Sequence, residues 1–145
     1  MAVATYDPGE VQCIIGGTPI SGYADGTFVN LAWASDLFTK TVGADGEVSR
    51  AKSNDRTGTL TLTLLQTSAS NDVLSGYAEA DRLSNSGVVP VLIKDASGRT
   101  LLLATGWVGR YPDVNFAKDD QQRAWQIHLA QVNAFIGGNA DSTAN

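Results

Sequence analysis

The chain contains 145 residues, of which 43% are hydrophobic and 17% are charged, and its formal net charge is −5. These values are typical of a globular domain with its own core and exclude an intrinsically disordered chain. An acidic chain without a basic stripe is poorly suited to hold nucleic acid, because neutralised phosphates supply most of that affinity.

The cysteine count and the hydropathy pattern restrict the chain further. Cys13 is the one cysteine, so we expect neither an intrachain disulfide nor a cysteine-based zinc cluster, and we interpret it as an inert core thiol. The N-terminal residues show no basic region followed by an apolar run, and no window approaches about 18 apolar residues. We therefore expect neither a signal peptide nor a membrane anchor.

Short strands separated by turns are expected in the N-terminal part of the chain. Val11–Ile15 is an apolar run of strand length, and Gly16-Gly17 is suited to a tight hairpin turn. Residues 27–34 are predicted to form a further strand. Because apolar side chains occur on both faces of this strand, we expect it to be covered on both sides.

Residues 36–56 are predicted to form a projecting hairpin arm. Asp45-Gly46 is typical of a two-residue turn in which both central residues take positive φ. The segment carries four acids and four bases and few large apolar groups, so it can bury little surface in its own domain. An isolated hairpin is marginal in water, so we expect the arm to be stabilised on another copy of the chain. The alternative is a solvated loop.

A strand and a helix are expected after the arm. From residue 57 to residue 65, Leu60, Leu62 and Leu64 alternate with threonines, which is typical of a half-buried strand. Residues 70–84 place apolar side chains at helical spacing. We expect Ser70 to cap the first turn of this helix and Asn85-Ser86-Gly87 to end it.

The C-terminal half returns to strands, at 88–94, 99–105, 114–116 and 123–132. Pro90 cannot donate to a strand ladder, so we expect it at a sheet edge or a bulge. Residues 137–145 are expected to form a flexible tail. The fold class that these elements predict is mainly β (α+β), an antiparallel sandwich or barrel in one domain over 1–136, with the helix flanking an open side.

No arrangement of residues predicts an enzyme. His128 is the one histidine and lies on the polar face of a strand without a neighbouring nucleophile motif, so we interpret it as structural. Asp119-Asp120 is a bare acidic pair and is expected to be a solvated turn. Neither glycine pair fits a nucleotide-binding loop. We therefore predict no catalytic residue, no cofactor and no metal ligand.

Three blocks of sequence, in this order and spacing, resemble a bacteriophage family. They are residues 43–50 (GADGEVSR), 54–75 (NDRTGTLTLTLLQTSASNDVLS) and 87–101 (GVVPVLIKDASGRTL). From about residue 11 to about residue 132 the chain resembles the tail tube (inner tube) proteins of contractile-tailed, myovirus-type phages. The resemblance implies a β-sandwich or barrel with a flanking helix, hexameric rings stacked into a hollow tube inside a contractile sheath, and a lumen lined by a continuous β-barrel.

The resemblance also implies contacts and partners. An arm that reaches a neighbouring ring is implied, and the matching positions for such inter-subunit contacts are Phe38, Asp45, Gly46, Glu47, Arg50, Asp55 and Arg56. The implied partners are copies of the chain itself, the tail sheath protein, baseplate and tail-terminator proteins, and the tape measure protein and DNA in the lumen without specific binding. The implied location is the virion tail after assembly in the host cytoplasm. We hypothesise that the acidic excess faces the lumen, where it would let phosphate pass without sticking.

Three other functions are compatible with these residues, the first in the same functional class and the other two in different classes. The same fold would serve in a related contractile injection system, such as a tailocin or a type VI secretion system. A carbohydrate-binding β-sandwich would use an exposed row formed by Trp33, Trp107 or Trp125. A β-fold hydrolase would require His128.

Overall fold

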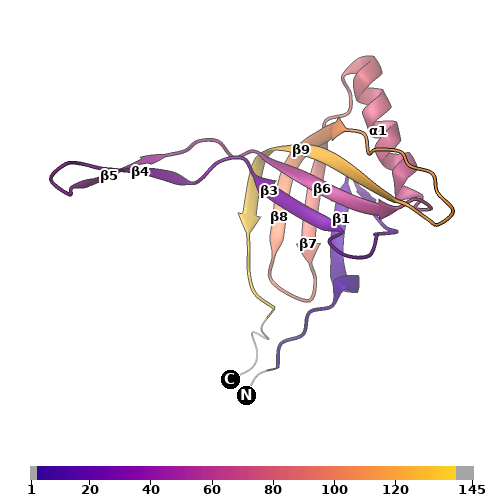
Figure 1. Cartoon of the computed structure of the whole chain (residues 1–145), viewed down its shortest axis with the longest axis horizontal. Coiled ribbons are helices and arrows are strands. Elements are labelled where there is room, and N and C mark those ends of the chain that lie inside the picture. Colours follow the sequence, from indigo (N-terminus) through magenta and orange to yellow (C-terminus); the bar gives the residue numbers. More distant parts are fainter. Residues whose placement is uncertain (1–2, 140–145) are drawn as a thin grey trace.

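The computed structural model describes residues 3–139 and consists of one strongly bent sheet, a helix and a detached hairpin (Figure 1). A short 3-10 helix, η1 (Pro8–Glu10), precedes the sheet, and the helix is α1 (Ser70–Ser84). The sheet strands are β1 (Val11–Ile15), β2 (Thr18–Pro19), β3 (Val29–Trp33), β6 (Gly58–Leu65), β7 (Val89–Asp95), β8 (Leu101–Arg110) and β9 (Gln122–Phe135). The hairpin strands are β4 (Phe38–Val42) and β5 (Val48–Lys52). Within residues 3–139, no helix combines the length and the apolar character needed to cross a membrane.

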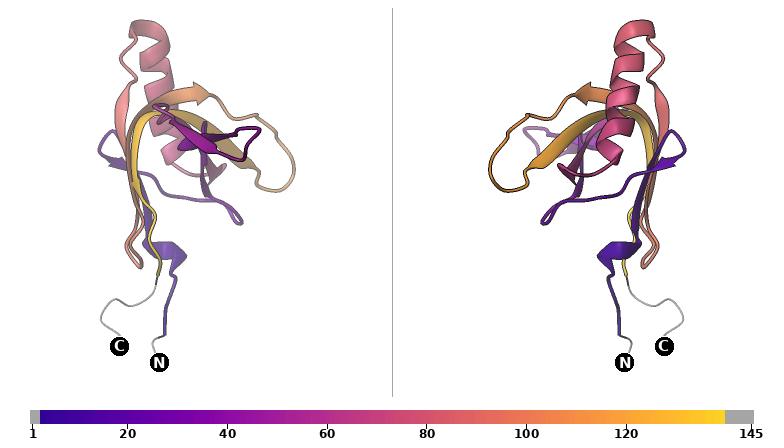
Figure 2. Two further views of the ribbon diagram at one scale, coloured as in Figure 1. Left: turned by 90° about the vertical axis from the view of Figure 1, so that its left-hand side faces the viewer. Right: turned by 90° about the vertical axis from the view of Figure 1, so that its right-hand side faces the viewer.

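The seven strands are antiparallel and follow the order β2-β1-β7-β8-β9-β6-β3. The long strands β8 and β9 belong to both halves of the sheet, because β9 pairs first with β6 and then, further along, with β8. Two register shifts in the β8–β9 pair and a left-handed residue, Gln131 with φ 53°, bend the sheet between these halves. The sheet thereby folds over itself (Figure 2), and we call the halves the β7 layer (β2, β1, β7 and the adjoining β8 and β9) and the β6 layer (β3, β6 and the adjoining β9 and β8).

The core lies between the two layers. Leu60, Leu62 and Leu64 of β6 are fully buried, and Trp125 and Ile127 of β9 lie beside them. The alternation predicted for 57–65 is therefore confirmed, since every second residue of β6 is buried. The facing layer adds Cys13, Ile15, Val91 and Ile93. Burial of one such aliphatic side chain contributes about 1.5–3 kcal/mol to folding, and this is why the two layers stay together.

Helix α1 covers the open end of the two layers and packs against β8 (Figure 1). Leu74 and Ala78 are its buried apolar residues, and the Tyr77 hydroxyl donates to the Ile15 carbonyl at 3.2 Å. Asn85 ends the helix in the left-handed conformation, as predicted. The prediction that Ser70 caps the helix is wrong. Ala69 occupies the cap position, and the buried Ser70 hydroxyl accepts instead from the Ser21 amide at 2.9 Å.

Strand β3 lies at the edge of the sheet, and the expectation that both of its faces are covered is wrong, because Asn30 and Ala32 on its outward face are exposed. It pairs with β6 alone, and its exposed residues include Asn30, Ala32 and Trp33. The apolar residues on its inner face contact the core only in part, because the chain leaves the body directly after Trp33 to enter the arm.

Pro90 lies in an interior strand, between β1 and β8, and not at an edge or a bulge as predicted. Its carbonyl accepts from the Gly16 amide at 2.8 Å, so the side of Pro90 that lacks an N–H faces β1. At that point β1 has ended in its Gly16-Gly17 turn. The missing donor therefore costs no ladder bond, which explains why an interior strand tolerates the proline.

Two C-terminal segments differ from the sequence expectations. Residues 114–116 form no strand and belong to an exposed loop between β8 and β9. Of the expected tail 137–145, residues 140–145 lie outside the described part of the chain. Its first residues contact the β7–β8 turn, where Gly137 accepts from the Thr100 hydroxyl and the Asn139 amide group donates to Asp95 at 2.9 Å.

The packing of β6 predicts a sharp difference between its two faces. Leu62→Ala should lower the free energy of unfolding by about 2–5 kcal/mol, because it opens a cavity in the core. Thr61→Ala, one position away on the outward face, should change it by less than about 1 kcal/mol. Denaturant unfolding of the unassembled protein, followed by tryptophan fluorescence, measures both. Equal losses in the two variants would contradict this packing.

Candidate assembly surface

The hairpin arm formed by β4 and β5 projects from the body, and all ten of its strand residues are exposed (Figure 1). The cross-strand register sorts its side chains into two faces, because paired residues of antiparallel strands lie on the same side. One face, here called the basic arm face, carries Phe38, Lys40, Val42, Val48, Arg50 and Lys52. The opposite face carries the small residues Thr39, Thr41, Ser49 and Ala51.

The basic arm face is electrostatically unfavourable in a single copy of the chain. Lys40 lies directly opposite Arg50, and like charges in this position destabilise a strand pair. The Arg50 guanidinium lies 4.3 Å from the centre of the Phe38 ring, a cation–π contact that relieves part of the repulsion. A face with three cations and exposed valines is therefore chemically suited to an acidic and apolar partner.

The tip of the arm is a five-residue loop, Gly43 to Glu47, so the two-residue Asp45-Gly46 turn predicted from the sequence is wrong. The Gly46 amide donates to the Gly43 carbonyl at 3.0 Å, and the Gly43 amide donates to the Glu47 carbonyl at 2.7 Å. Gly46 alone takes the left-handed conformation there, with φ 88°, because a turn followed by a left-handed glycine also closes hairpins. The Asp45 carboxylate accepts from the Glu47 amide at 3.2 Å.

Asp55 holds the joint at which the arm leaves the body. The β3–β6 ladder continues to a bond from the Ala34 amide to the Thr57 carbonyl, and a bond from the Ser53 amide to the Leu37 carbonyl begins the arm. Between them, the Asp55 carboxylate accepts from the Ser35 hydroxyl at 2.6 Å and from the Thr57 amide and hydroxyl. These bonds to the ionised form, that from Ser35 first, lower the pKa of Asp55.

Arg56 fixes the same joint to β9. Its guanidinium donates twice to the Val132 carbonyl, at 3.1 and 2.9 Å, and its own carbonyl accepts from the Val132 amide. Of the seven predicted contact residues, Phe38 and Arg50 therefore meet on the basic arm face, and Asp45, Gly46 and Glu47 form the tip. Asp55 and Arg56 bind within their own chain and set the direction of the arm.

The loop 111–121, at the end of the body opposite the arm, is a feature that the sequence analysis missed (Figure 1). Val114 and Phe116 are 62% and 80% exposed, and Asp113, Asp119 and Asp120 are exposed beside them. The Tyr111 hydroxyl donates to Glu79 of α1 and so anchors one end of the loop. The sequence signal for this surface was the apolar pair Val114 and Phe116 among acidic residues. It was interpreted as a short strand at 114–116 and not as an exposed loop.

The outward face of the β6 layer is polar and almost free of charge. The cross-strand rows place Asn30, Thr61 and Gln126 side by side, and next to them Thr59 and His128. Arg110 is the charged strand residue of this face in the described chain, and Asp113 lies 3.4 Å from it. The His128 ring packs beside Trp107 and over Gly109, where any Cβ would collide with the imidazole.

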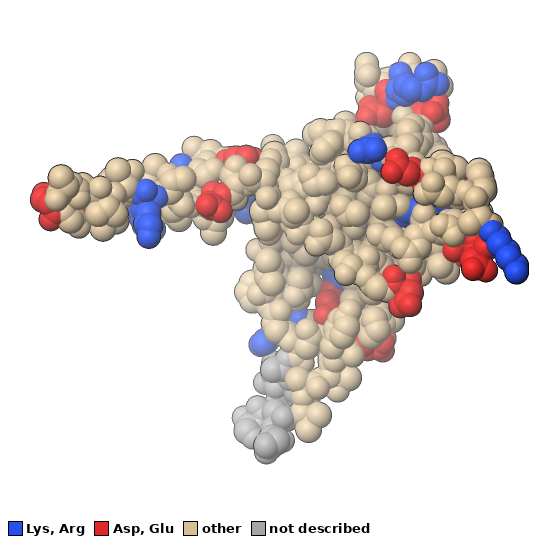
Figure 3. Space-filling model, viewed as in Figure 1, with Lys and Arg blue, Asp and Glu red and all other residues tan. Residues whose placement is uncertain are grey.

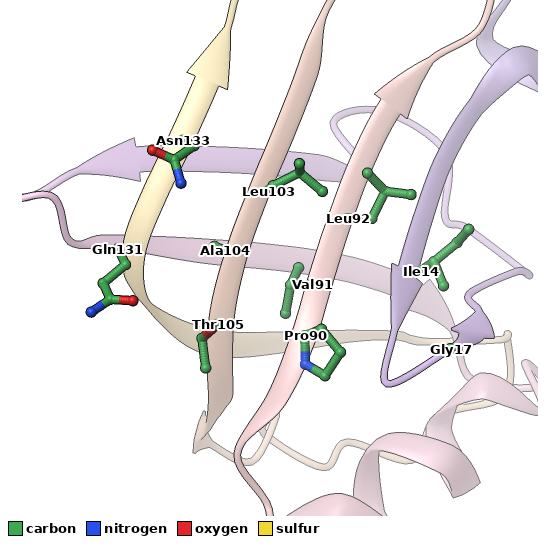
Figure 4. A pocket seen from close by; sticks show the side chains of 10 residues that line it. All are labelled: Ile14, Gly17, Pro90, Val91, Leu92, Leu103, Ala104, Thr105, Gln131 and Asn133. Carbon is green, nitrogen blue, oxygen red and sulfur yellow. The ribbon is translucent and has the colours of Figure 1, made fainter.

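The outward face of the β7 layer is apolar and slightly hollow (Figure 4). Ile14, Leu92 and Leu103 form one cross-strand row, and the hollow around them has a volume of about 460 Å³. Thr105, Gln131 and Asn133 border it. Leu103 is 48% exposed, so this face offers apolar surface to whatever covers it.

The acidic excess lies on the helix, the turns and the loops of the body, because acids and bases are equal in number in the arm segment 36–56. Figure 3 shows charged side chains on the arm, at the helix end and at the end opposite the arm, while the middle of that view of the body carries few. In the described strands, neither outward sheet face presents an acidic side chain. The hypothesis that the acidic excess faces a lumen stays a prediction, and it would require turns or loops to line the channel, because the strand positions facing outward carry threonine, amides or apolar groups.

Chemical groups that could act in catalysis or in sugar binding are not brought together. Burial raises the pKa of the Cys13 thiol to about 12, so the sulfur stays protonated. Across residues 3–139, no three His, Cys, Asp or Glu side chains gather to hold a metal ion. Trp125 is 2% exposed, and Trp33 and Trp107 lie on opposite sides of the β6 layer, so the three tryptophans form no exposed row.

The geometry of a body with a projecting arm agrees with the comparison to known families. Residues 4–137 match the family described as the bacteriophage PhiTE tail tube protein. The chain belongs to this family of phage tail tube proteins. This chain is also 32% identical, over 145 residues, to structural protein ORF10 of Pseudomonas phage KPP10, with 94% of this chain and 84% of that relative covered.

Solved structures with the same fold come from contractile machines. The tube terminating cap of the anti-feeding prophage has a TM-score of 0.63 at 8% identity, with 93% of this chain and 94% of the cap covered. A chain of the sheath–tube complex of the extracellular contractile injection system PVC has a TM-score of 0.61 at 8% identity, with 90% and 91% covered. The predicted fold class and the structural role in the phage tail tube are thus confirmed. The absence of enzymatic activity stays a prediction.

From the hydrogen bonds of Asp55 at the joint, we predict that the arm takes a wider range of orientations relative to the body in acid. Because the pKa of Asp55 is lowered in the folded chain, its bonds hold the joint above the ordinary aspartate pKa of about 4 and are lost as the pH falls through the lower folded value. Spin labels at Ala44 and Ala124 should give a distance distribution that broadens in acid. Asp55→Asn should broaden it already at pH 7.

Asp36→Asn provides the matched control for this measurement, because Asp36 is an exposed acid of the same joint with none of these bonds. Its distance distribution should remain that of the unmodified chain at pH 7. Identical broadening in both variants would contradict the role of Asp55.

Proposed function

We propose that residues 1–136 of this chain act as one assembly domain that forms hexameric rings, and that these rings stack into the inner tube of a contractile phage tail through which DNA passes to the host. The observation that carries this proposal is the arm, a hairpin whose side chains have no surface to pack on within one chain. Membership of the tail tube family supports it. So do the similar folds in a sheath–tube complex and in a sheath/tube terminator.

Ring formation would use the free edge of β3. This strand ends the sheet order, and its outer backbone groups have no strand partner in the described chain. An unpaired edge is a template for a further strand. In a head-to-tail contact, this edge of one copy would pair with a different edge of the next copy. Such contacts close into a ring when a whole number of the rotations between neighbouring copies makes up 360°.

The channel wall would be the outward face of the β6 layer. Its threonine, asparagine and glutamine side chains keep a wetted surface. Its described strand positions carry no lysine and one arginine, Arg110, which lies 3.4 Å from Asp113, so little counterion release is available to hold DNA. The apolar hollow of the β7 layer is poorly suited to line a water-filled channel, since it exposes leucine. A neutral polar wall would let the DNA backbone slide without holding it.

Further partners follow from the same proposal. The tail sheath protein would surround the tube, baseplate and terminator proteins would bind its two ends, and the tape measure protein would occupy the lumen before DNA. Assembly would take place in the host cytoplasm. A tube of an injection system without a capsid is the second candidate, supported by the similar folds in PVC and in the anti-feeding prophage, and the presence of capsid genes beside the coding sequence would decide between them.

Removing the outer part of the arm should separate folding from assembly. Replacing Val42–Val48 by an Asn-Gly turn removes exposed residues only, so the melting temperature of the unassembled protein should stay within a few degrees of the original. Tubes should be absent by negative-stain electron microscopy, because neighbouring rings lose their contact. Asp45→Asn keeps the full-length tip and should still form tubes. Normal tubes from the shortened chain would refute the role of the arm.

A lysine on the channel wall should make the tube retain DNA. Gln126→Lys places one cation per copy on the outward face of the β6 layer, and tubes of this variant should co-sediment with short duplex DNA at low salt and release it as salt rises. Leu83→Lys on the exposed side of α1 adds the same charge elsewhere. Equal retention by both variants, or none by Gln126→Lys, would show that another face lines the channel.

A further inference from the structure

We propose that the basic arm face of one copy docks on the loop 111–121 of a second copy, so that each arm bridges to the far end of its neighbour. This inference rests on the proposed stacking of rings and names the surface that receives the arm. The inference rests on complementary side chains at opposite ends of the molecule. The arm presents apolar groups and cations, and the loop 111–121 presents apolar groups and anions.

The arm supplies one half of the match. Its basic face presents Val42 and Val48, which are 57% and 63% exposed, together with Phe38. Lys40, Arg50 and Lys52 surround them, and no acid lies within the two arm strands. The contact of Arg50 with the Phe38 ring offsets the repulsion between Lys40 and Arg50 only in part, and anions that approach this face would relieve it further.

The loop supplies the other half. Val114 and Phe116 project from it, and Phe116 is the more exposed of the two at 80%. Asp113, Asp119 and Asp120 flank them and lie exposed. Asp113 pairs with Arg110 at 3.4 Å and Lys118 lies in the same loop, so Asp119 and Asp120 are the carboxylates that the arm would meet. The loop is held in place by the Tyr111 bond to Glu79 and by the Arg123 guanidinium, 5.7 Å from the Phe116 ring, so it offers a surface that is already shaped before binding.

Other surfaces of the chain fit the arm less well. The hollow of the β7 layer is apolar, but Lys94 is the charged side chain among its outward strand residues and would repel the arm. On α1, Glu79 is bonded to Arg82 and Tyr111, and Asp81 accepts from the Gly87 amide. Two of the three helix acids are therefore engaged within the chain, and Asp72 is a single exposed acid. Asp119 and Asp120 of the loop are adjacent, and among the described residues neither forms an ion pair.

The placement of the two surfaces determines the type of assembly. They lie at opposite ends of the body (Figures 1 and 3), so a contact between them is head-to-tail and leaves one arm and one loop free after each step. Such a heterologous contact continues without closing and produces a filament. A stack of rings requires this type of contact along its axis.

Charge exchange between the two surfaces tests the proposal. Lys40→Glu with Lys52→Glu reverses the arm, and Asp119→Lys with Asp120→Lys reverses the loop. Each pair alone should raise the concentration needed for tube formation at least about tenfold, as measured by sedimentation. The chain that carries all four substitutions should assemble within about threefold of the original, because opposite charges again face each other. Asp25→Lys with Asp72→Lys reverses exposed acids elsewhere and should leave assembly unchanged.

Failure of the four-fold variant to recover, with each reversed pair folded by circular dichroism, would overturn the docking on the loop. The effect of shortening the arm would still stand in that case, so the proposed function and this inference fail separately. A cross-link provides an independent measurement. In a Cys13→Ala background, Val48→Cys with Phe116→Cys should give a ladder of disulfide-linked copies under oxidising conditions, and Val48→Cys with Leu92→Cys should not. A ladder only from the second pair would place the arm in the hollow of the β7 layer.

Discussion

The arm is an extension of the β3–β6 pair, and this one constraint shapes the rest of the molecule. Its backbone groups satisfy each other across β4 and β5, but its side chains face solvent on both sides. Satisfied backbone without a core cannot supply stability of its own. The body must therefore hold the root of the arm firmly, and it does so through Asp55 across the joint and Arg56 on the Val132 carbonyl.

The body separates two requirements that a tube wall must meet. The core between the layers is packed with leucine, isoleucine and tryptophan, and none of its residues belongs to the arm. The two outward faces then differ in character, one with threonine and amides and the other with leucine and isoleucine. Because successive strand side chains point to opposite faces of the sheet, the same strands supply the core with one set of residues and the outer surface with another. The residue types of the two surfaces can therefore differ independently.

The sequence predicted most of the strands, the helix and the existence of the arm, because these depend on local periodicity. The Leu60, Leu62 and Leu64 alternation and the left-handed Asn85 are such cases. The position of β3 at an edge and of Pro90 inside the sheet depend on which strands become neighbours, and periodicity carries no such information. The loop 111–121 was not predicted, because only its exposure in the folded chain distinguishes its apolar residues from those of a buried strand. The length of the loop at the tip of the arm was predicted wrongly, because Asp-Gly is common both in two-residue hairpin turns and in longer hairpin loops that end in a left-handed glycine.

The three cations on the arm have a further consequence for subunits that are still free. Two arms that approached each other with these faces would bring lysine and arginine against lysine and arginine. This repulsion discourages pairing between newly made copies, although each exposes valine and phenylalanine on a bare hairpin. Subunits would thus stay dispersed in the cell until a growing end with the opposite charge captures them, and elongation would be favoured over random clumping.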